Sequence, residues 1–169
     1  MANYSIIRIE KKKNLRSLAK TYAHNYRTAE WAAPMAIDEY RNRNQELIDY
    51  DFGVPDRDFV KIYHKKVAES SYYKTHKVRK NAVPAIEILM SYSKEMDSKI
   101  DIDKWKKKNV EWLKKTYGED NVISCMFHDD ERRDDDPNGT GRHMHAVVIP
   151  IDERGALNAS QIVGGKIQL

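Results

Sequence analysis

Three histidines stand in the sequence with a spacing that can bind a metal. His143 and His145 are one residue apart at the head of an apolar run, and His128 ends another apolar run. In a strand, alternate side chains share a face, so His143 and His145 point the same way. If residues 122–128 and 143–149 pair as antiparallel strands, His128 meets both of them. Three neutral imidazoles suit manganese, zinc or nickel better than magnesium, which prefers oxygen ligands.

The same residues allow other interpretations. A lone histidine at a strand end is usually a satisfied polar residue, but a pair with a third at hairpin spacing is harder to explain that way. The first half of a calcium loop is imitated by Asp134, Asp136, Asn138 and Gly139. Its twelfth position is His145 rather than glutamate, and Pro137 interrupts it, so we exclude calcium. The sequence also lacks the H-E-x-x-H pattern of zinc proteases and the P-C-x-x-C pattern of zinc deaminases.

Charge is distributed unevenly along the chain. The net charge is +4, but residues 1–30 and 61–80 are strongly basic, whereas residues 129–136 hold six acids and two arginines. Either basic run alone is typical of a solvated face. Two of them beside an acidic, histidine-containing segment favour a polyanion held against a cation site.

Composition limits the class of protein. The chain has 169 residues, enough for one domain with a hydrophobic core, and 33% of them are charged. No apolar run reaches the roughly 20 residues that span a bilayer, and the N-terminus has no signal-peptide pattern. The one cysteine, Cys125, lies in an apolar run and suits a reducing compartment. We therefore expect one domain over residues 1–169, located in the cytoplasm.

The N-terminal half is predicted to carry a strand and two helices. Residues 4–10 read as a strand buried on both sides. Asn14 can cap a helix whose apolar stripe is Leu15, Leu18, Ala19 and Tyr22. His24 and Arg27 lie near the end of that helix, three residues apart. Residues 40–50 are expected to be helical.

The C-terminal half alternates the two kinds of element. Residues 59–73 form a basic amphipathic stretch, and residues 83–93 contain a strand that Pro84 can only begin. A helix opens at Asp101 or Asp103 and is stopped by Gly118, with Trp105, Trp112 and Leu113 as its buried stripe. Strands follow over residues 122–128 and 143–149.

Taken together, the motifs resemble a known family. The segments H-x-D-E (His128, Asp130, Glu131) and H-M-H (His143–His145) resemble the HUH signature of relaxases, most closely the Mob/Pre (MobV) plasmid mobilisation and recombination family. Four further segments agree in order, and they are "HNYR" at 24–27, "NQEL" at 44–47, "VRKNAV" at 78–83 and "YGEDNV" at 117–122. Each motif is weak alone, but five in the right order are fairly specific.

The resemblance implies a fold and a reaction. The fold would be α+β in two layers, with a central antiparallel sheet flanked by helices and the HUH strand pair at its centre. Relaxases cut one DNA strand at an origin of transfer, hold its 5′ end covalently and later rejoin it. The metal ligands would be His128, His143 and His145, around a divalent ion: manganese first, with magnesium, zinc or nickel as alternatives. His24 would be the nucleophile, since relatives of this type use that histidine.

Chemistry assigns further residues to this scheme. Neutral imidazole attacks phosphorus near pH 7 without a base, and Glu131 can orient a metal-bound histidine. Arg27 and Arg79 can clamp the phosphate, with Arg27 also counted as a catalytic residue. Asn44 and Lys80 complete the predicted DNA contacts, and lysines of the basic runs would track the backbone of single-stranded or supercoiled DNA. Tyr26, Tyr72 or Tyr73 can stack on bases.

The chain also departs from the family pattern at three places. The loop 132–142 is longer than in relatives, and Arg142 occupies a position where they have proline. Relatives often show R-x-x-R before the "KNAV" strand, where this chain has His76 and Arg79. The chain stops at "GGKIQL", before the helix expected to follow, so we interpret it as the N-terminal catalytic part of a longer protein. The absent C-terminal region is a candidate for self-association or for membrane binding.

Three other functions stay open from the sequence. An HUH rolling-circle replication initiator or transposase would use a tyrosine, and Tyr22 and Tyr26 flank His24. A non-catalytic DNA-binding module would use its metal only to pin the sheet. A small-molecule metalloenzyme would leave the two basic runs unexplained.

Overall fold

A five-stranded antiparallel sheet forms the middle of the protein. The computed structural model describes residues 5–131 and 141–164. The strands are β1 (Ser5–Lys12), β2 (Gln45–Glu46), β3 (Ala85–Tyr92), β4 (Val122–His128) and β5 (His143–Val148), and their order across the sheet is β1-β3-β5-β4-β2. The histidine strands β4 and β5 pair with each other inside the sheet, so the predicted central HUH pair is confirmed.

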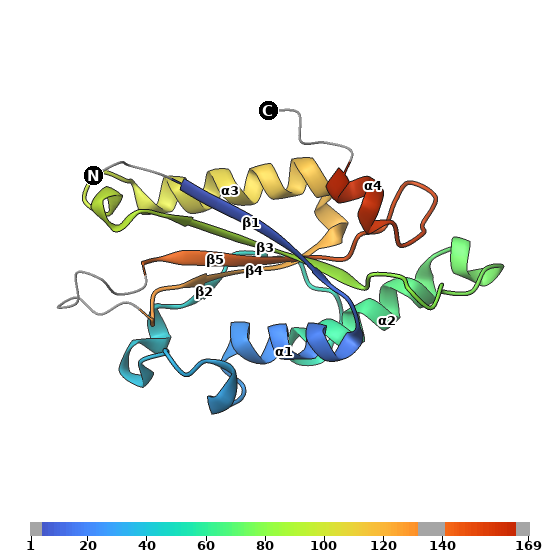
Figure 1. Ribbon diagram of the computed structural model, residues 1–169, viewed down its shortest axis with the longest axis horizontal. Helices are drawn as coiled ribbons and strands as arrows, with labels where there is room; N and C mark the ends of the chain where they lie inside the picture. Colours follow the sequence, from blue (N-terminus) through green and yellow to red (C-terminus); the bar gives the residue numbers. More distant parts are fainter. Residues whose placement is uncertain (1–4, 132–140, 165–169) are drawn as a thin grey trace.

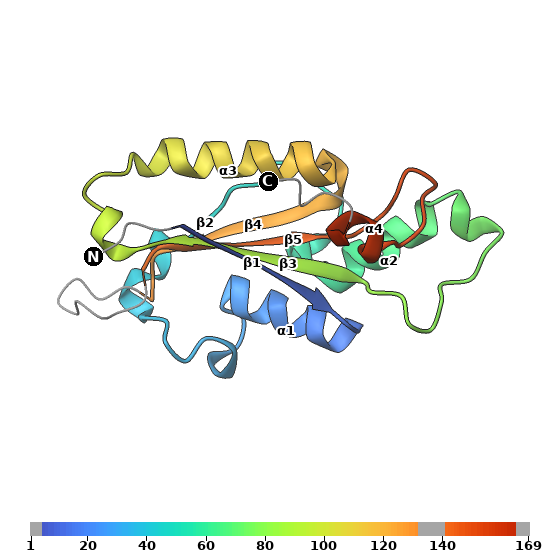
Figure 2. The same cartoon turned by 45° about the horizontal axis from the view of Figure 1, so that its top comes forward.

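Helices lie on both faces of this sheet. Helices α1 (Leu15–Tyr26) and α2 (Phe59–Glu69) cover one face, α3 (Ile102–Tyr117) covers the other, and the short α4 (Ala159–Gly164) lies near the end of α3 (Figures 1 and 2). The predicted α+β fold is confirmed, with three layers where two were expected. Because both faces are covered, β4 is buried along its whole length. Among the described residues, no helix combines the length and apolar character needed to cross a bilayer.

Strand β1 is less buried than the sequence predicted. It lies at one edge of the sheet and pairs with β3 alone. Ile7 and Ile9 are 52% and 36% exposed. An edge strand receives cover from one neighbour instead of two, and the alternation of isoleucines in the sequence does not reveal where in the sheet a strand lies. The predicted two-sided burial is therefore wrong.

The segment from residue 40 to 50 is not the predicted α-helix. It begins in the 3₁₀ helix Asp38–Arg43 and then forms β2, which pairs with β4 at Gln45↔Phe127 and Glu46↔Met126. The amide of Leu47 donates to the carbonyl of Cys125 at 2.9 Å, which extends the pairing. Hydrogen bonds to the free edge of β4 thus override the local helical pattern.

Helix α3 matches its predicted bounds but not its whole stripe. The Asp101 side chain caps it by accepting from the amide of Lys104, and Gly118 ends it at φ 89°. Leu113 is fully buried, and Trp105 packs edge-on against Tyr92 at 5.0 Å between ring centroids. Trp112 is 37% exposed, so the prediction that it belongs to the buried stripe is wrong.

Candidate metal and catalytic site

Strand pairing brings the predicted metal ligands together. His128 lies opposite His143, and Met126 lies opposite His145. The ring centroids are 5.3 Å apart for His128–His143, 5.2 Å for His128–His145 and 5.0 Å for His143–His145. The three imidazoles therefore converge at one end of the sheet, as the hairpin spacing predicted.

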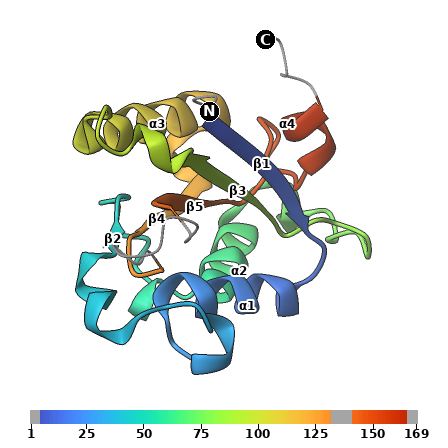
Figure 3. The ribbon, with the colours of Figure 1, turned by 60° about the vertical axis from the view of Figure 1, so that its left-hand side comes forward.

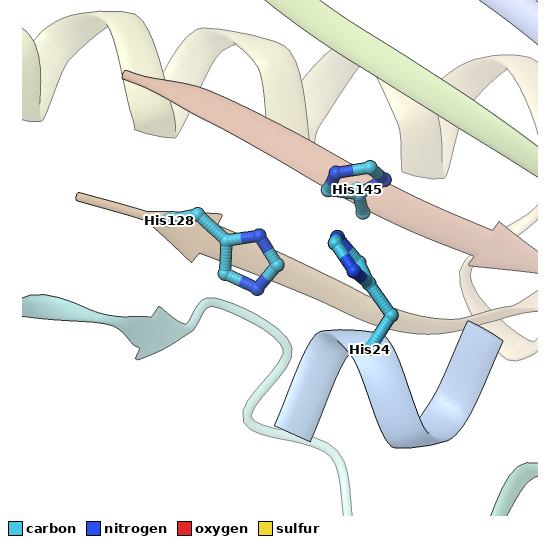
Figure 4. A group of neighbouring side chains, drawn as sticks. All are labelled: His24, His128 and His145. Atoms are coloured by element: carbon cyan, nitrogen blue, oxygen red, sulfur yellow. The ribbon is translucent and has the colours of Figure 1, made fainter. Parts of the chain in front are cut away.

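Helix α1 brings a fourth imidazole to the same place. Asn14 and Ser17 form a capping box that fixes the start of the helix, and Arg27 ends it in the left-handed region at φ 54°. His24, in the last turn, lies with its ring centroid 5.0 Å from that of His145 and 5.4 Å from that of His128. Figure 4 shows the three side chains pointing toward one another from α1, β4 and β5.

Hydrogen bonds fix the tautomer of each ring. A carbonyl or carboxylate oxygen can only accept, so the ring nitrogen facing it carries the proton. These pairs are His24 Nδ1 with Ala32 O at 2.8 Å, His128 Nε2 with Asn25 O at 3.0 Å, His143 Nδ1 with Gly141 O at 2.9 Å and His145 Nδ1 with Glu87 Oε1 at 2.9 Å. The other nitrogen of each ring is then left with a free lone pair, ready to bind a cation or attack phosphorus.

These lone pairs fit a divalent transition metal. The buried Nδ1 of His128 has no hydrogen-bond partner, which is costly for a polar atom unless a ligand binds there. Ligand atoms lie within 4.8 Å of one another in two overlapping sets, His24 with His128 and His145, and His128 with Glu131 and His143. The donors are mainly imidazole nitrogens, which suit manganese, zinc or nickel.

Burial keeps these rings neutral. Desolvation lowers the pKa of His24, His128 and His143 below the ordinary value of 6.5, because a buried imidazolium loses its hydration. The positive charge of Arg27 lowers the pKa of His24 and His128 further. At pH 7 the three side chains therefore keep the neutral form that binds metals and acts as a nucleophile.

Arg27 is held by the acidic turn that follows β4. Its guanidinium donates to both carboxylate oxygens of Asp130, at 2.8 and 2.6 Å, to Glu131 at 2.9 Å and to the carbonyl of His24 at 2.6 Å. Its side chain is 5% exposed. Arg27 thus joins the end of α1 to the H-x-D-E turn. Its predicted contact with phosphate stays a prediction.

Glu131 and Asn44 also lie at this turn. Glu131 is close to two imidazoles, with 3.9 Å to His24 Nε2 and 3.8 Å to His143 Nε2. At these distances Glu131 accepts no hydrogen bond from either ring, so its predicted orienting role stays a prediction, and its carboxylate is placed where it can bind an ion together with His128 and His143. The Asn44 side chain accepts from the amide of Asp129 at 2.9 Å. Asn44 thus braces the turn, and its contact with DNA stays a prediction.

Sequence reasoning missed the carboxylate that holds His145. Glu87, on β3, accepts from His145 Nδ1 and is paired with Lys12 at 2.5 Å. Burial alone would raise the pKa of Glu87, but the hydrogen bond from His145 and the Lys12 charge outweigh it and lower the pKa to about 2. A glutamate at the centre of the apolar strand "AIEILM" was the available signal, because such a residue is rarely buried without a partner.

Arg79 and Lys80 lie away from the histidines. They belong to the loop before β3, and the Ala85 end of β3 follows them, whereas Leu89 and Ser91 are the residues that pair with His145 and His143. Arg79 donates to the carbonyl of Leu157 at 3.5 Å, and both residues are exposed. A clamp on the phosphate that faces the histidines is therefore not formed by Arg79, and a contact with more distant DNA stays a prediction. The excluded calcium loop falls largely outside the described residues.

The comparisons with known proteins agree with this geometry. The sequence matches the Mob_Pre family, described as plasmid recombination enzyme, over residues 1–169. It is 29% identical to a 65 kDa protein of Zymomonas mobilis over 98% of this chain and 26% of that protein. It is 24% identical to plasmid recombination enzyme type 1 of Staphylococcus aureus over 97% of this chain and 38% of that protein. The chain thus spans well under half the length of these relatives.

Solved structures share the fold. The relaxase domain of MobM, bound to origin-of-transfer DNA of plasmid pMV158 in a manganese-bound crystal, superposes with a TM-score of 0.75 at 23% identity, over 94% of this chain and 76% of that chain. A second manganese-bound crystal of the same domain with this DNA, at pH 4.6, gives a TM-score of 0.72 at 24% identity, again over 94% and 76%. The match over the whole sequence and the histidine pair at the centre of the sheet lead to one conclusion: the chain belongs to the Mob_Pre family of plasmid recombination enzymes.

Proposed function

We propose that this chain nicks one DNA strand at an origin of transfer and holds the 5′ end on His24 as a phosphoramidate. The observation that carries the proposal is the state of His24. Its Nδ1 proton is fixed on Ala32 O, so its Nε2 lone pair is free, and its ring lies 5.0 Å from that of His145. The substrate class is supported by the family and by the origin DNA bound to the related MobM domain.

A divalent ion would be held by His128, His143 and His145. Manganese is the first candidate, since the related MobM crystals are manganese-bound; the imidazole donors by themselves suit zinc or nickel equally well. Bound there, the ion supplies positive charge that offsets the negative charge developing on the phosphate. Glu87 and the backbone carbonyls hold the proton-bearing nitrogen of each ring, which leaves the other nitrogen of each ring free to bind the ion.

The reaction itself is carried by His24. Its Nε2 lone pair forms a bond to phosphorus, the bond from phosphorus to the 3′ oxygen breaks, and that oxygen takes a proton from solvent. The ring becomes cationic, and Ala32 O, which accepts from Nδ1, stabilises that charge. Glu131 lies 3.9 Å from Nε2 and adds a negative charge nearby. Attack by a 3′ hydroxyl reverses the same steps and rejoins the strand.

The two flanking tyrosines are poorer nucleophiles in this structure. Tyr26 donates to Glu46 at 2.5 Å, and Tyr22 donates to the carbonyl of Asp56 at 2.8 Å. Burial and nearby carboxylates raise the pKa of both phenols. Both rings pack against Phe59 of α2. These contacts favour His24 over the tyrosine mechanism of replication initiators and transposases.

A basic stripe leads along α1 to the nucleophile. Arg16 and Lys20 are exposed and precede His24 by eight and four residues, so the three lie on the same side of the helix. Phosphates of a single strand following this stripe would arrive at His24. Self-association through a region outside this chain and a cytoplasmic location remain predictions.

The proposal is tested by trapping the covalent product. The purified chain is incubated with single-stranded oligonucleotides from the origin of its own element, with and without manganese, and adducts are located by mass spectrometry. We expect an adduct on His24 that survives alkali, is lost in mild acid and needs the ion. His24→Ala should abolish it, whereas His64→Ala, at an exposed histidine on α2, should leave it unchanged.

Three results would overturn this assignment. An adduct on a tyrosine, with nicking retained by His24→Ala, would establish a tyrosine HUH enzyme. Salt-sensitive origin binding without cleavage, under every metal tested and with the ion confirmed as bound, would establish a DNA-binding module. Binding that does not change with salt would instead favour a small-molecule metalloenzyme.

A further inference from the structure

Two exposed apolar side chains lie in one short loop after α1. Trp31 is 66% exposed and Met35 is 65% exposed, the two highest values among large apolar residues in the described part of the chain. Tryptophan is among the most buried residues on average, and leaving its large apolar surface in water is unfavourable. In Figure 3 the segment that follows α1 lies on the outer side of the molecule. A tryptophan held there is positioned to bind something.

The loop is attached at two points to the candidate active site. Ala32 O accepts the Nδ1 proton of His24 at 2.8 Å, and the amide of Ile37 donates to the carbonyl of Asp130 at 2.8 Å. Asp130 is in turn paired with Arg27. Because neighbouring Cα atoms are about 3.8 Å apart, the Trp31 side chain starts one residue from the carbonyl that holds the nucleophile.

We propose that Trp31 binds a nucleobase of the DNA strand, next to the phosphate that His24 attacks. This inference rests on the proposed function and adds a base-binding subsite to it. An indole offers a flat face on which any base can stack, and such contacts recur where proteins hold single strands. Met35 supplies a second apolar contact from the same loop. Arg16 and Lys20 hold phosphates, and Trp31 holds the base.

The tyrosines predicted to stack on bases are already engaged. Tyr26 donates to Glu46, Tyr72 is stacked on His76 with 4.1 Å between centroids, and the Tyr73 hydroxyl accepts from the amide of Leu157. Trp31 has no aromatic partner among the ring contacts of the described residues. The indole of Trp31 is therefore accessible for stacking, whereas one face of the Tyr72 ring is covered by His76.

A coupling experiment tests the subsite. Binding of single-stranded origin DNA to the wild type and to Trp31→Ala is measured by fluorescence anisotropy, with a set of oligonucleotides that each lack one base around the nick site. We expect that removing the base at one position weakens binding to the wild type by about 5- to 150-fold, the range of one stacking contact. The same missing base should change the affinity of Trp31→Ala only slightly. Trp31→Phe should retain most of the effect. Trp112→Ala, at the exposed tryptophan of α3 on the other face, should behave as the wild type.

Three outcomes would overturn the inference. The first is equal affinity of the wild type and Trp31→Ala for the intact oligonucleotide. The second is a loss of affinity on base removal that is the same in both proteins. The third is a change in oligomeric state caused by Trp31→Ala, which would mark a protein interface. The His24 adduct is measured separately. If the His24 adduct forms but the effect of base removal does not depend on Trp31, only the base-binding proposal is wrong. If the effect depends on Trp31 but no adduct forms, the nicking proposal is wrong and the base contact is retained.

Discussion

The two ends of β3 carry polar residues in opposite conditions. At the end that pairs with His143 and His145, one nitrogen of each histidine ring is held by an oxygen, and the Asp130 side chain is fully buried against Arg27. At the other end, Arg79 and Lys80 are exposed, and Arg79 reaches one carbonyl at 3.5 Å. The first end holds its side chains in fixed orientations. The second can supply charge but little orientation.

This difference separates two kinds of contribution to one function. Groups that orient a nucleophile need rigid partners, because small displacements are costly in catalysis. Groups that attract DNA act through a screened field and tolerate mobility. Substitutions at the histidine end should therefore change stability and chemistry together, and those at the other end should change only the salt dependence of binding.

The largest effect is expected from Arg27→Ala. The substitution leaves the buried carboxylate of Asp130 without its counter-charge, and removing one partner of such a pair typically costs about 3–5 kcal/mol. Denaturant unfolding should show that loss, and the His24 adduct should disappear because Arg27 also holds the carbonyl of His24. Arg27→Lys should restore part of the stability but not the two-pronged contact.

Arg79→Ala is the matched control for that change. It removes a guanidinium from the exposed end, so unfolding should shift by less than about 0.5 kcal/mol. Equal destabilisation by Arg27→Ala and Arg79→Ala would end the distinction drawn between the two ends.

A second large effect concerns Glu87 and pH. Its pKa is lowered from 4.5 to about 2 in the fold. A carboxylate with a lowered pKa stabilises the fold above its unfolded pKa, and that stability is lost as pH falls from about 4.5 toward 2. At 1.36 kcal/mol per pKa unit the contribution is roughly 3 kcal/mol. Glu87→Gln should therefore be less stable at pH 7 and should lose less stability than the wild type between pH 5 and pH 2.

Urea unfolding across that range checks the Glu87 prediction. Glu69→Gln, at an exposed residue on α2, is its control and should keep the wild-type pH dependence. A Glu87→Gln curve parallel to the wild type would mean that the pair with Lys12 and His145 contributes nothing specific to the fold.

A smaller effect is expected for DNA binding at the exposed end. Each lysine or arginine that contacts a phosphate releases counterions, and on a single strand the slope of log K against log salt changes by about 0.7 per contact. Lys80→Ala should lower the slope by that amount if DNA reaches this loop, with the His24 adduct intact. An unchanged slope, measured by titration at several salt concentrations, would confine the DNA to the histidine end.

The sequence predicted those parts of the site that depend on residues close together in the chain, and it missed those that depend on distant residues. The pairing of His128 with His143 was predictable, because strand period and hairpin spacing are local properties. The place of His24 beside them came from the family resemblance, since a helical histidine has no signal of its own. Three polar groups of the site are held by residues from other segments: His24 by Ala32, His145 by Glu87 and Arg27 by Asp130. Contacts between distant segments cannot be predicted from a local sequence pattern.

Errors in the fold have the same origin. The sequence of β1 has the alternation of a strand, but its position at the sheet edge depends on which other strands exist. Residues 40–50 have helical residues, but the open edge of β4 recruits Gln45 and Glu46 into the sheet. Arg27 and Arg79 read alike in the sequence. Only the fold shows that one faces buried carboxylates and the other faces solvent.

The smallest expected effect is a pH dependence that stays flat. A nucleophile with the ordinary imidazole pKa of 6.5 would be half protonated at pH 6.5 and would lose about half its rate there. Burial lowers the pKa of His24, so its neutral form persists below that pH. The single-turnover rate of adduct formation, at saturating manganese, should therefore stay nearly constant between pH 7.5 and pH 6.5, where a pKa of 6.5 would make it fall by about 1.8-fold. A half-maximal rate at or above pH 6.5 would mean that the pKa of His24 is not lowered and that its ring is exposed to solvent. The histidine end of β3 would then not differ from the exposed end in burial.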